Sequence, residues 1–241
     1  MRSYQIMKPK SFFKKLFLGY EVIEKVNSPI NGEITVVEDL FGKREMRIGK
    51  VTQSGGLVEK LWGKILNFKF LIFNQFLNSN FKCLILGLGC GTVAKLISNK
   101  FPKTKMVGVE IDPEVVKIGK KYFDLGKIDN LEIIVGDAFK PEKWEVRNGK
   151  LDKEVRGENY DLILVDLYLG QEFPKEAESD DFLSGLKKVL NKNGLVIFNR
   201  LYYNYEHQRE AEEFLKKLKN VFPNIQTRKI LTNMLIFASK Y

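Results

Sequence analysis

The chain has 241 residues, 44% of them hydrophobic, so it can form one large α/β domain or a domain with a small appendage. Its single histidine and two cysteines exclude a Cys/His metal cluster and a disulfide framework, and we expect no metal and a cytoplasmic location. The net charge of +10 comes from scattered lysines, which predicts a solvated surface rather than a nucleic-acid interface, and no apolar run reaches the roughly 20 residues of a membrane span.

Three patterns precede the main part of the chain. Residues 2–15 are locally basic, and the segment 11–20 predicts a short amphipathic helix capped by Ser11 that packs on the domain, with contact to a membrane or partner as the alternative. From 20 to 53 hydrophobic residues alternate around a turn at 41–43, which predicts a small antiparallel unit of about three strands. From 56 to 76 the spacing becomes helical, and the apolar stripe of the expected helix comprises Leu57, Leu61, Ile65, Phe68 and Leu71.

The remaining residues alternate between strands and helices, which predicts a parallel sheet covered on both faces. We expect strands at 82–87, 105–110, 131–136, 160–166 and 194–199. We expect helices near 92–100, 113–122, 178–191 and 205–220. The last residues predict two antiparallel strands around a turn near Thr232 and Asn233, and the polar segment 140–158 predicts a surface excursion.

The fold class is therefore α/β: a doubly wound, mostly parallel seven-stranded sheet with a small N-terminal antiparallel β unit. We divide the chain into an N-terminal segment with the small β unit, 1–54, and a nucleoside-binding domain, 55–241.

The stretch from Lys82 to Pro113 carries the strongest functional signal. An apolar strand opens into glycines, a helix follows, and the next strand stops at Glu110. Glycines let a ligand approach the backbone, and a carboxylate about 20 residues further on can accept both ribose hydroxyls. This order predicts a cofactor that contains a nucleoside. Because residues 89–94 also fit the G-x-G-x-x-A form of dinucleotide binders, an NAD-dependent oxidoreductase remains an alternative.

Acidic residues follow the next two strands as well. Asp137 can accept a hydrogen bond from an adenine amino group while the Ala138 amide meets a ring nitrogen, although Asp137 could equally cap the following turn. Asp166 comes at the carboxyl edge above the expected cofactor crevice. Asp112 precedes Pro113 and predicts a helix start, and Asp161 begins a strand, so we assign both a structural role.

These segments resemble the spermidine synthase superfamily over nearly the whole chain. The resemblance is carried by the stretches LILGLGCGTVAKL, VGVEIDPEVVKIGKKYF, IIVGDAF, YDLILVDLY and NMLIFAS. It implies a methyltransferase-type fold in which Glu110 binds ribose, Asp137 binds the adenine amino group and Asp166 faces the transferred group. It also implies that the small β unit takes part in dimerisation, and we expect a homodimer because that unit has exposed strand edges. We assign the cofactor to Gly87, Gly89, Cys90, Gly91, Glu110, Asp137 and Ala138, and catalysis to Asp166.

The chain also departs from the aminopropyltransferases of that superfamily. They carry an acid where Cys90 stands and a second acid where Leu169 stands, and residues 55–60 replace an acidic segment. A polyamine is a polycation and needs several carboxylates to hold it. The departures favour methyl transfer from intact S-adenosylmethionine to an unknown small-molecule acceptor. Aminopropyl transfer from decarboxylated S-adenosylmethionine and a non-catalytic nucleoside-binding protein remain alternatives.

The acceptor side is predicted from residues that follow strand ends. Gln53, Tyr168 and Arg200 are the expected acceptor-binding residues, and others expected near the crevice are Gln171, Asn199, Tyr202 and Tyr203. A cation at Arg200 suits an anionic or neutral acceptor better than a polyamine, and its alternative role is a surface ion pair.

Overall fold

The computed structural model of the protein describes residues 17–67, 80–140, 160–170 and 172–240. Several expectations lie outside these ranges. They are the basic start at 2–15 with the beginning of the helix expected over 11–20, the part of the helix 56–76 beyond Asn67, the surface excursion beyond Lys140, and Gln171.

The N-terminal β unit is an antiparallel sheet of four strands in the order β1-β2-β3-β4, where about three were predicted. The strands are β1 (Tyr20–Ser28), β2 (Gly32–Asp39), β3 (Arg44–Ile48) and β4 (Val51–Gly55). The additional strand is β4, because Gly49 adopts a left-handed conformation with φ 57° and allows a tight turn directly after β3.

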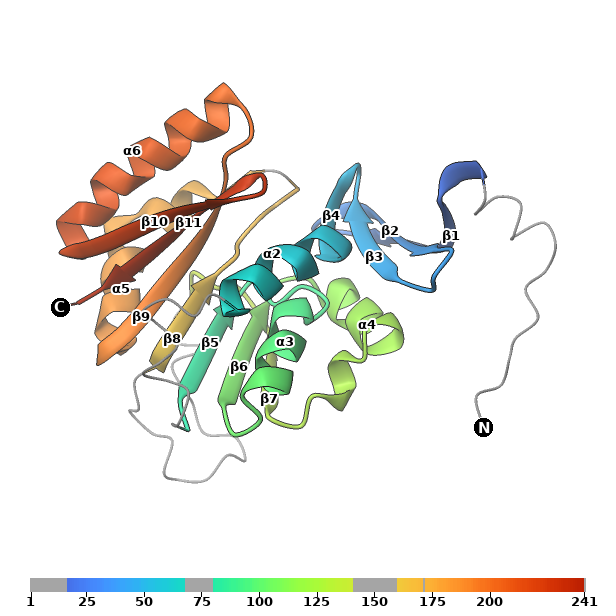
Figure 1. Ribbon diagram of the computed structural model, residues 1–241, viewed down its shortest axis with the longest axis horizontal. Coiled ribbons are helices and arrows are strands. Elements are labelled where there is room, and N and C mark those ends of the chain that lie inside the picture. The colour runs from blue at the N-terminus through green and yellow to red at the C-terminus, as the bar shows by residue number, and fades with distance from the viewer. Residues whose placement is uncertain (1–16, 68–79, 141–159, 171, 241) are drawn as a thin grey trace.

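The main sheet has seven strands in the order β10-β11-β9-β8-β5-β6-β7 (Figure 1). They are β5 (Lys82–Leu86), β6 (Lys105–Glu110), β7 (Leu131–Val135), β8 (Tyr160–Val165), β9 (Leu190–Leu201), β10 (Asn224–Ile230) and β11 (Asn233–Ser239). Pairs among β5 to β9 are parallel, and β11 pairs antiparallel with both β9 and β10. The predicted seven-stranded, mostly parallel α/β class with a closing hairpin is confirmed. β9 is longer than the predicted 194–199, and the preceding helix is correspondingly shorter.

Helices cover both faces of this sheet through two separate apolar clusters. The α-helices are α2 (Gly56–Asn67), α3 (Thr92–Lys100), α4 (Pro113–Tyr122), α5 (Asp180–Val189) and α6 (Tyr205–Val221). Side chains of α2 and α3 pack on one face, and those of α5 and α6 pack on the other; Figure 1 shows α2 and α3 lying over the parallel strands. None of the helices in the described ranges has the length and apolar character that a membrane span requires.

The small sheet is joined to the main domain by an apolar cluster and by Asp112. The cluster comprises Ile34, Val36 and Met46 from the small sheet, Cys90 from the glycine loop, and Val115 and Ile118 from α4. Asp112 caps α4 as predicted, accepting a 2.8 Å hydrogen bond from the Glu114 N–H. Its other carboxylate oxygen accepts from Ser28 Oγ and from Asn31 Nδ2 at 2.7 Å. The cap therefore also holds the β1–β2 turn against the domain.

Candidate active site

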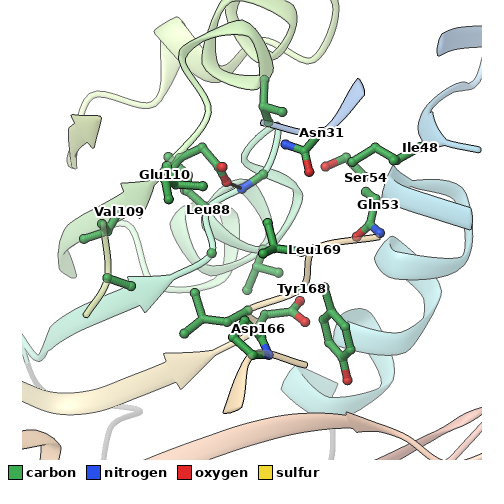
Figure 2. A pocket seen from close by; sticks show the side chains of 18 of the residues that line it. Asn31, Ile48, Gln53, Ser54, Leu88, Val109, Glu110, Asp166, Tyr168 and Leu169 are labelled. Atoms are coloured by element: carbon green, nitrogen blue, oxygen red, sulfur yellow. Dashed lines mark hydrogen bonds between the residues drawn. The ribbon is translucent and has the colours of Figure 1, made fainter. Parts of the chain in front are cut away.

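A pocket lies where the carboxyl ends of β5, β6, β7 and β8 meet the small sheet and α2. The sheet edge contributes its lining residues Gly87, Leu88, Gly89, Val109, Glu110, Ile111, Gly136, Asp137, Ala138, Asp166, Leu167, Tyr168 and Leu169. The N-terminal elements contribute Asn31, Met46, Ile48, Gln53, Ser54 and Val58. Figure 2 shows Glu110 and Asp166 at the pocket, with Asn31, Gln53 and Ser54 facing them from the N-terminal elements. The three acids predicted at consecutive strand ends thus come together in one site.

Gly87 is a glycine for two reasons that the structure makes plain. Its φ is 87°, a left-handed conformation that side chains rarely adopt. A Cβ there would lie 2.2 Å from the carbonyl oxygen of Asp166. The Cβ is attached directly to the backbone and the carbonyl oxygen is part of it, so the clash could be relieved only by a shift of the backbone itself. The glycine therefore sets how closely the end of β5 approaches Asp166.

Of the other predicted loop residues, Gly89 lines the pocket and Gly91 does not. A Cβ at Gly89 would lie 2.9 Å from Ser54 Oγ, whereas a Cβ at Gly91 would meet Leu125 Cδ1 at 2.4 Å. Gly91 also precedes α3 with φ 85°. Gly89 therefore keeps space beside the small sheet, and Gly91 allows Leu125 to pack closely against the start of α3.

The side chain of Cys90 is turned away from the pocket. It is fully buried in the cluster under the small sheet, with Sγ 3.3 Å from Met46 Sδ. Its N–H donates to Ser54 Oγ at 2.9 Å. Burial raises the pKa of the thiol, so the side chain behaves as a small apolar group. Only the backbone of Cys90 is left to contribute to ligand binding.

Glu110 organises the glycine loop and forms part of the pocket wall. Its Oε2 accepts from the Gly89 N–H at 2.8 Å, and its Oε1 accepts from the Asp112 N–H at 3.1 Å. Burial raises the pKa of this carboxyl, and the two N–H groups act in the opposite direction. A carboxylate has about four acceptor positions, so these bonds leave room for the two hydroxyls of a ribose.

Asp137 has the capping role considered for it and also lines the pocket. Its Oδ1 accepts from the Phe139 N–H at 2.9 Å and so caps the turn after β7. Asp137 and Ala138 both line the pocket, next to Gly136. The cap holds the carboxyl in place, and its remaining lone pairs are the kind of acceptor that an exocyclic amine requires.

Asp166 lies at the pocket wall with both carboxylate oxygens engaged. Its Oδ1 accepts from Asn199 Nδ2 at 2.7 Å, and its Oδ2 accepts from Trp62 Nε1 at 3.1 Å. The residue keeps partial exposure on the pocket side. Burial raises the pKa of the carboxyl against the effect of these two donors. Trp62 was not identified as a site residue from the sequence, because it lies in an apolar helical segment and resembles a core residue.

Two of the three expected acceptor-binding residues line the pocket. Gln53 Nε2 donates to the Gly170 carbonyl at 2.6 Å, which links β4 to the loop after β8. Tyr168 presents its ring to the pocket, while its hydroxyl accepts from the Leu201 N–H at 2.8 Å and donates to the Asn199 carbonyl at 3.0 Å. The Tyr168 hydroxyl therefore has a structural role, because it ties the loop after β8 to the main chain of β9.

The structure does not bring Arg200 to the pocket. Its side chain is 3% exposed, pairs with Glu178 at 2.9 Å, and lies 4.0 Å from the centroid of the Phe173 ring. Successive residues of a strand point to opposite faces of the sheet. Asn199 therefore points to the α2 side and Asp166, and Arg200 points to the α5 and α6 side. It forms a buried ion pair where an acceptor contact or a surface ion pair was expected.

Of the other residues expected near the crevice, Asn199 reaches Asp166, whereas Tyr202 and Tyr203 lie elsewhere. Tyr202 donates its hydroxyl hydrogen bond to Glu212, and the partly exposed Tyr203 packs its ring against His207. Asp161 has the structural role predicted for it, since it accepts from the Lys82 N–H at 2.9 Å and from Asn191. Within the described ranges, no group of three or more His, Cys, Asp or Glu side chains is placed to hold a metal ion.

Comparison with known proteins identifies a matching family model. It is described as a methyltransferase domain, and it matches residues 79–239. A polyamine aminopropyltransferase from Vibrio vulnificus (strain CMCP6) is 31% identical over 129 residues, which are 53% of this chain and 40% of that protein. An eEF1A lysine and N-terminal methyltransferase from Mus musculus is 27% identical over 156 residues, 61% of this chain and 20% of that protein. The matches thus span less than half the length of either relative.

A solved structure shows the same fold over a larger share of the chain. The crystal structure of a probable spermidine synthase from Corynebacterium glutamicum ATCC 13032 gives a TM-score of 0.71 at 18% identity. The superposition covers 92% of this chain and 80% of that chain. The likeness therefore includes the small N-terminal sheet as well as the seven-stranded domain.

Proposed function

The chain belongs to the methyltransferase-domain family, and from this premise we propose that it is a transferase that uses S-adenosylmethionine to methylate a small acceptor. The strongest support is the arrangement of Glu110, Asp137 and Asp166 along the edge of one pocket. This arrangement suits a nucleoside at one end and a reacting group at the other. Family membership and the acid at Asp137 both argue against the NAD-dependent oxidoreductase alternative.

The residues present suit the adenosine part of such a donor. Glu110 would accept the ribose hydroxyls, and Asp137 with Ala138 would hold the adenine. Space is tight at Gly89, where a Cβ would already touch Ser54. Since Gly87 and Gly89 have no side chain, their backbone would lie directly against the ligand. Carboxylate acceptors beside backbone donors are the groups that a nucleoside with hydroxyls and an exocyclic amine requires.

Asp166 is the group suited to proton transfer. When bound, the donor's sulfonium supplies an activated carbon and a neutral thioether as leaving group. An acceptor nitrogen or oxygen that forms a bond to that carbon must lose one proton, and in this proposal Asp166 takes it. The pocket would contribute mainly by holding the acceptor in line, since orientation supplies much of the rate enhancement in such displacements.

Aminopropyl transfer is the second candidate, favoured by the similarity to the Vibrio vulnificus aminopropyltransferase. The residues on the acceptor side argue against aminopropyl transfer. Ile48, Gln53 and Leu169 line the pocket there, and none is the acid that a polyamine acceptor requires. The identity of residue 90 carries less weight than the sequence indicated, since the Cys90 side chain is fully buried and is not part of the pocket lining. Selection between the two donors would then depend on the acceptor side and the loop backbone.

Two further expectations become part of the proposal. We propose a homodimer through the small sheet, whose outer strand β1 leaves an unpaired edge in the described chain. We also propose a reducing, cytoplasmic location, since Cys83 and Cys90 are both buried and unpaired. The division at 1–54 and 55–241 stays a prediction, and it falls one residue before the end of β4.

Calorimetry on the purified protein tests the cofactor. We expect S-adenosylmethionine and S-adenosylhomocysteine to bind and NAD not to bind. Asp137→Ala should weaken S-adenosylhomocysteine binding by about 1–3 kcal/mol, because a donor on the adenine loses its partner. Asp129→Ala, at an exposed acid outside the pocket lining, is the matched control and should bind as the wild type does. Binding of NAD with no response to S-adenosylhomocysteine would refute the proposal.

A further inference from the structure

Three elements that are distant in sequence send hydrogen-bond donors toward Asp166. Trp62 on α2 donates from Nε1 to Oδ2, and Asn199 on β9 donates from Nδ2 to Oδ1. Behind Asn199, Asn233 on β11 donates from Nδ2 to Asn199 Oδ1 at 2.8 Å. None of these three residues has a role in the proposed function.

The orientation of each amide in this chain is determined by the next one. Thr232 Oγ1 donates to Asn233 Oδ1 at 2.9 Å, which leaves the Asn233 amide nitrogen to donate to Asn199. Asn199 therefore receives a donor on its oxygen and must present its own nitrogen to Asp166. All donors from Thr232 onward point toward the carboxylate. Hydrogen bonds aligned in this way polarise one another and favour negative charge at the end of the chain.

Packing alone does not account for these residues. Trp62 is completely buried, and Asn199 and Asn233 are 5% and 8% exposed. Buried amides lower stability unless they are paired, and the preceding residues of β9, Ile197 and Phe198, are apolar. An apolar residue at 199 would serve the core equally well. The two amides are explained if they serve to hydrogen-bond and orient the Asp166 carboxylate.

No charged partner holds Asp166 in the described part of the chain. On its own segment, the Tyr168 hydroxyl is engaged with the main chain of β9. On β9, Arg200 pairs with Glu178 on the opposite face. The helix α2 offers Trp62, which does not titrate, and β11 offers Asn233. Neutral donors alone therefore oppose the burial that raises the pKa of this carboxyl.

We propose that Trp62 and Asn199 are positioning residues that hold Asp166 in a fixed orientation as an ionised proton acceptor, and that Asn233 orients Asn199. This rests on the role proposed for Asp166 in group transfer. Two fixed neutral donors leave the lone pairs toward the pocket available, whereas a lysine or arginine partner would reduce the basicity of the carboxylate. Removal of either donor should make the carboxyl easier to protonate.

Nitrogen NMR of the tryptophan indoles measures this without any substrate. The chain has two tryptophans, Trp62 and Trp144, and Trp62→Phe assigns the two indole signals. We expect the Trp62 indole signal of the full chain to titrate with pH, and Asp166→Asn to abolish the titration. Asn199→Ala should move the midpoint upward by about one pH unit, a tenfold change in proton affinity. Asn233→Ala should move it in the same direction by less.

Asn191→Ala is the matched control. Asn191 Nδ2 donates to Asp161 near the start of β9, so this variant removes a similar Asn–Asp bond away from the pocket. It should leave the Trp62 midpoint unchanged. If Asn199→Ala does not fold, Asn233→Ala carries the same test from one residue further away. A Trp62 signal that is independent of Asp166, or that moves equally in the Asn191 variant, would overturn the proposal. Failure of S-adenosylhomocysteine to bind would instead count against the proposed function, since the titration uses the free protein.

Discussion

Gly87→Ala should be among the most damaging single substitutions in the pocket. Gly87 has φ 87°, and a left-handed conformation costs a residue with a side chain about 1–2 kcal/mol. The new Cβ would lie 2.2 Å from the Asp166 carbonyl oxygen and 2.8 Å from its carbon. Forcing an atom into a packed site typically costs about 1–3 kcal/mol more. We therefore expect the free energy of unfolding to fall by about 2–5 kcal/mol.

Gly87→Ala should also weaken ligand binding, because the new Cβ pushes the Asp166 backbone away from residue 87. The Asp166 N–H donates to the Leu86 carbonyl at 2.9 Å, so separating Gly87 from Asp166 strains the bond that joins β8 to β5 at the pocket. Urea unfolding measures the stability, and calorimetry with S-adenosylhomocysteine on the folded fraction measures the binding. Gly63→Ala is the matched control, because a Cβ at Gly63 within α2 meets no atom within 4 Å. That variant should be more stable by about 0.5–1 kcal/mol. Wild-type stability for Gly87→Ala would refute this reasoning.

Three other outcomes are expected. Cys90→Asp should lower the free energy of unfolding by about 3 kcal/mol or more, because the new carboxylate would be buried beside Met46. Donor preference should stay the same. Urea unfolding and donor competition measure the two effects, and a switched preference would contradict the side-chain direction at residue 90. Arg200→Met should cost about 1–3 kcal/mol of stability, because Glu178 loses one of its two cationic partners and keeps Lys217 at 3.1 Å. The affinity for S-adenosylhomocysteine should change little, and loss of binding in the folded variant would return Arg200 to the site. Light scattering should give twice the chain mass of 27.9 kDa, and a monomer at micromolar concentration would exclude the homodimer.

The order of elements was predictable because it depends on local patterns. Asp112 followed by Pro113 marks the start of α4, and the structure begins the helix at Pro113 with Asp112 as its cap. The acids at Glu110, Asp137 and Asp166 were also predictable, since parallel strands bring their carboxyl ends to one edge. These inferences require only the position of a residue along a strand or helix.

The direction of a side chain was harder to predict. In β9 the residues from Leu195 to Arg200 are all buried, so no alternation in the sequence distinguishes the two faces. Arg200 was therefore placed at the acceptor, whereas its neighbour Asn199 reaches Asp166. Cys90 is a similar case, because the left-handed conformations of Gly89 and Gly91 on either side turn its side chain toward Met46. Backbone geometry of this kind cannot be inferred from the types of residue alone.

The position of Cys90 also changes how a donor could be inferred from sequence in this chain. An acid at that position would matter to the donor only if its side chain faced the pocket, and here the Cys90 N–H is held by Ser54 while Sγ lies under the small sheet. Ser54 itself lies on β4, whose register with β3 shifts between Met46 and Arg47. The β4 bulge, the Ser54 hydroxyl and the side-chain direction at residue 90 are therefore linked. Under the proposed function, donor choice would depend on how the small sheet sits against the glycine loop, and a sequence comparison of the loop alone does not contain that information.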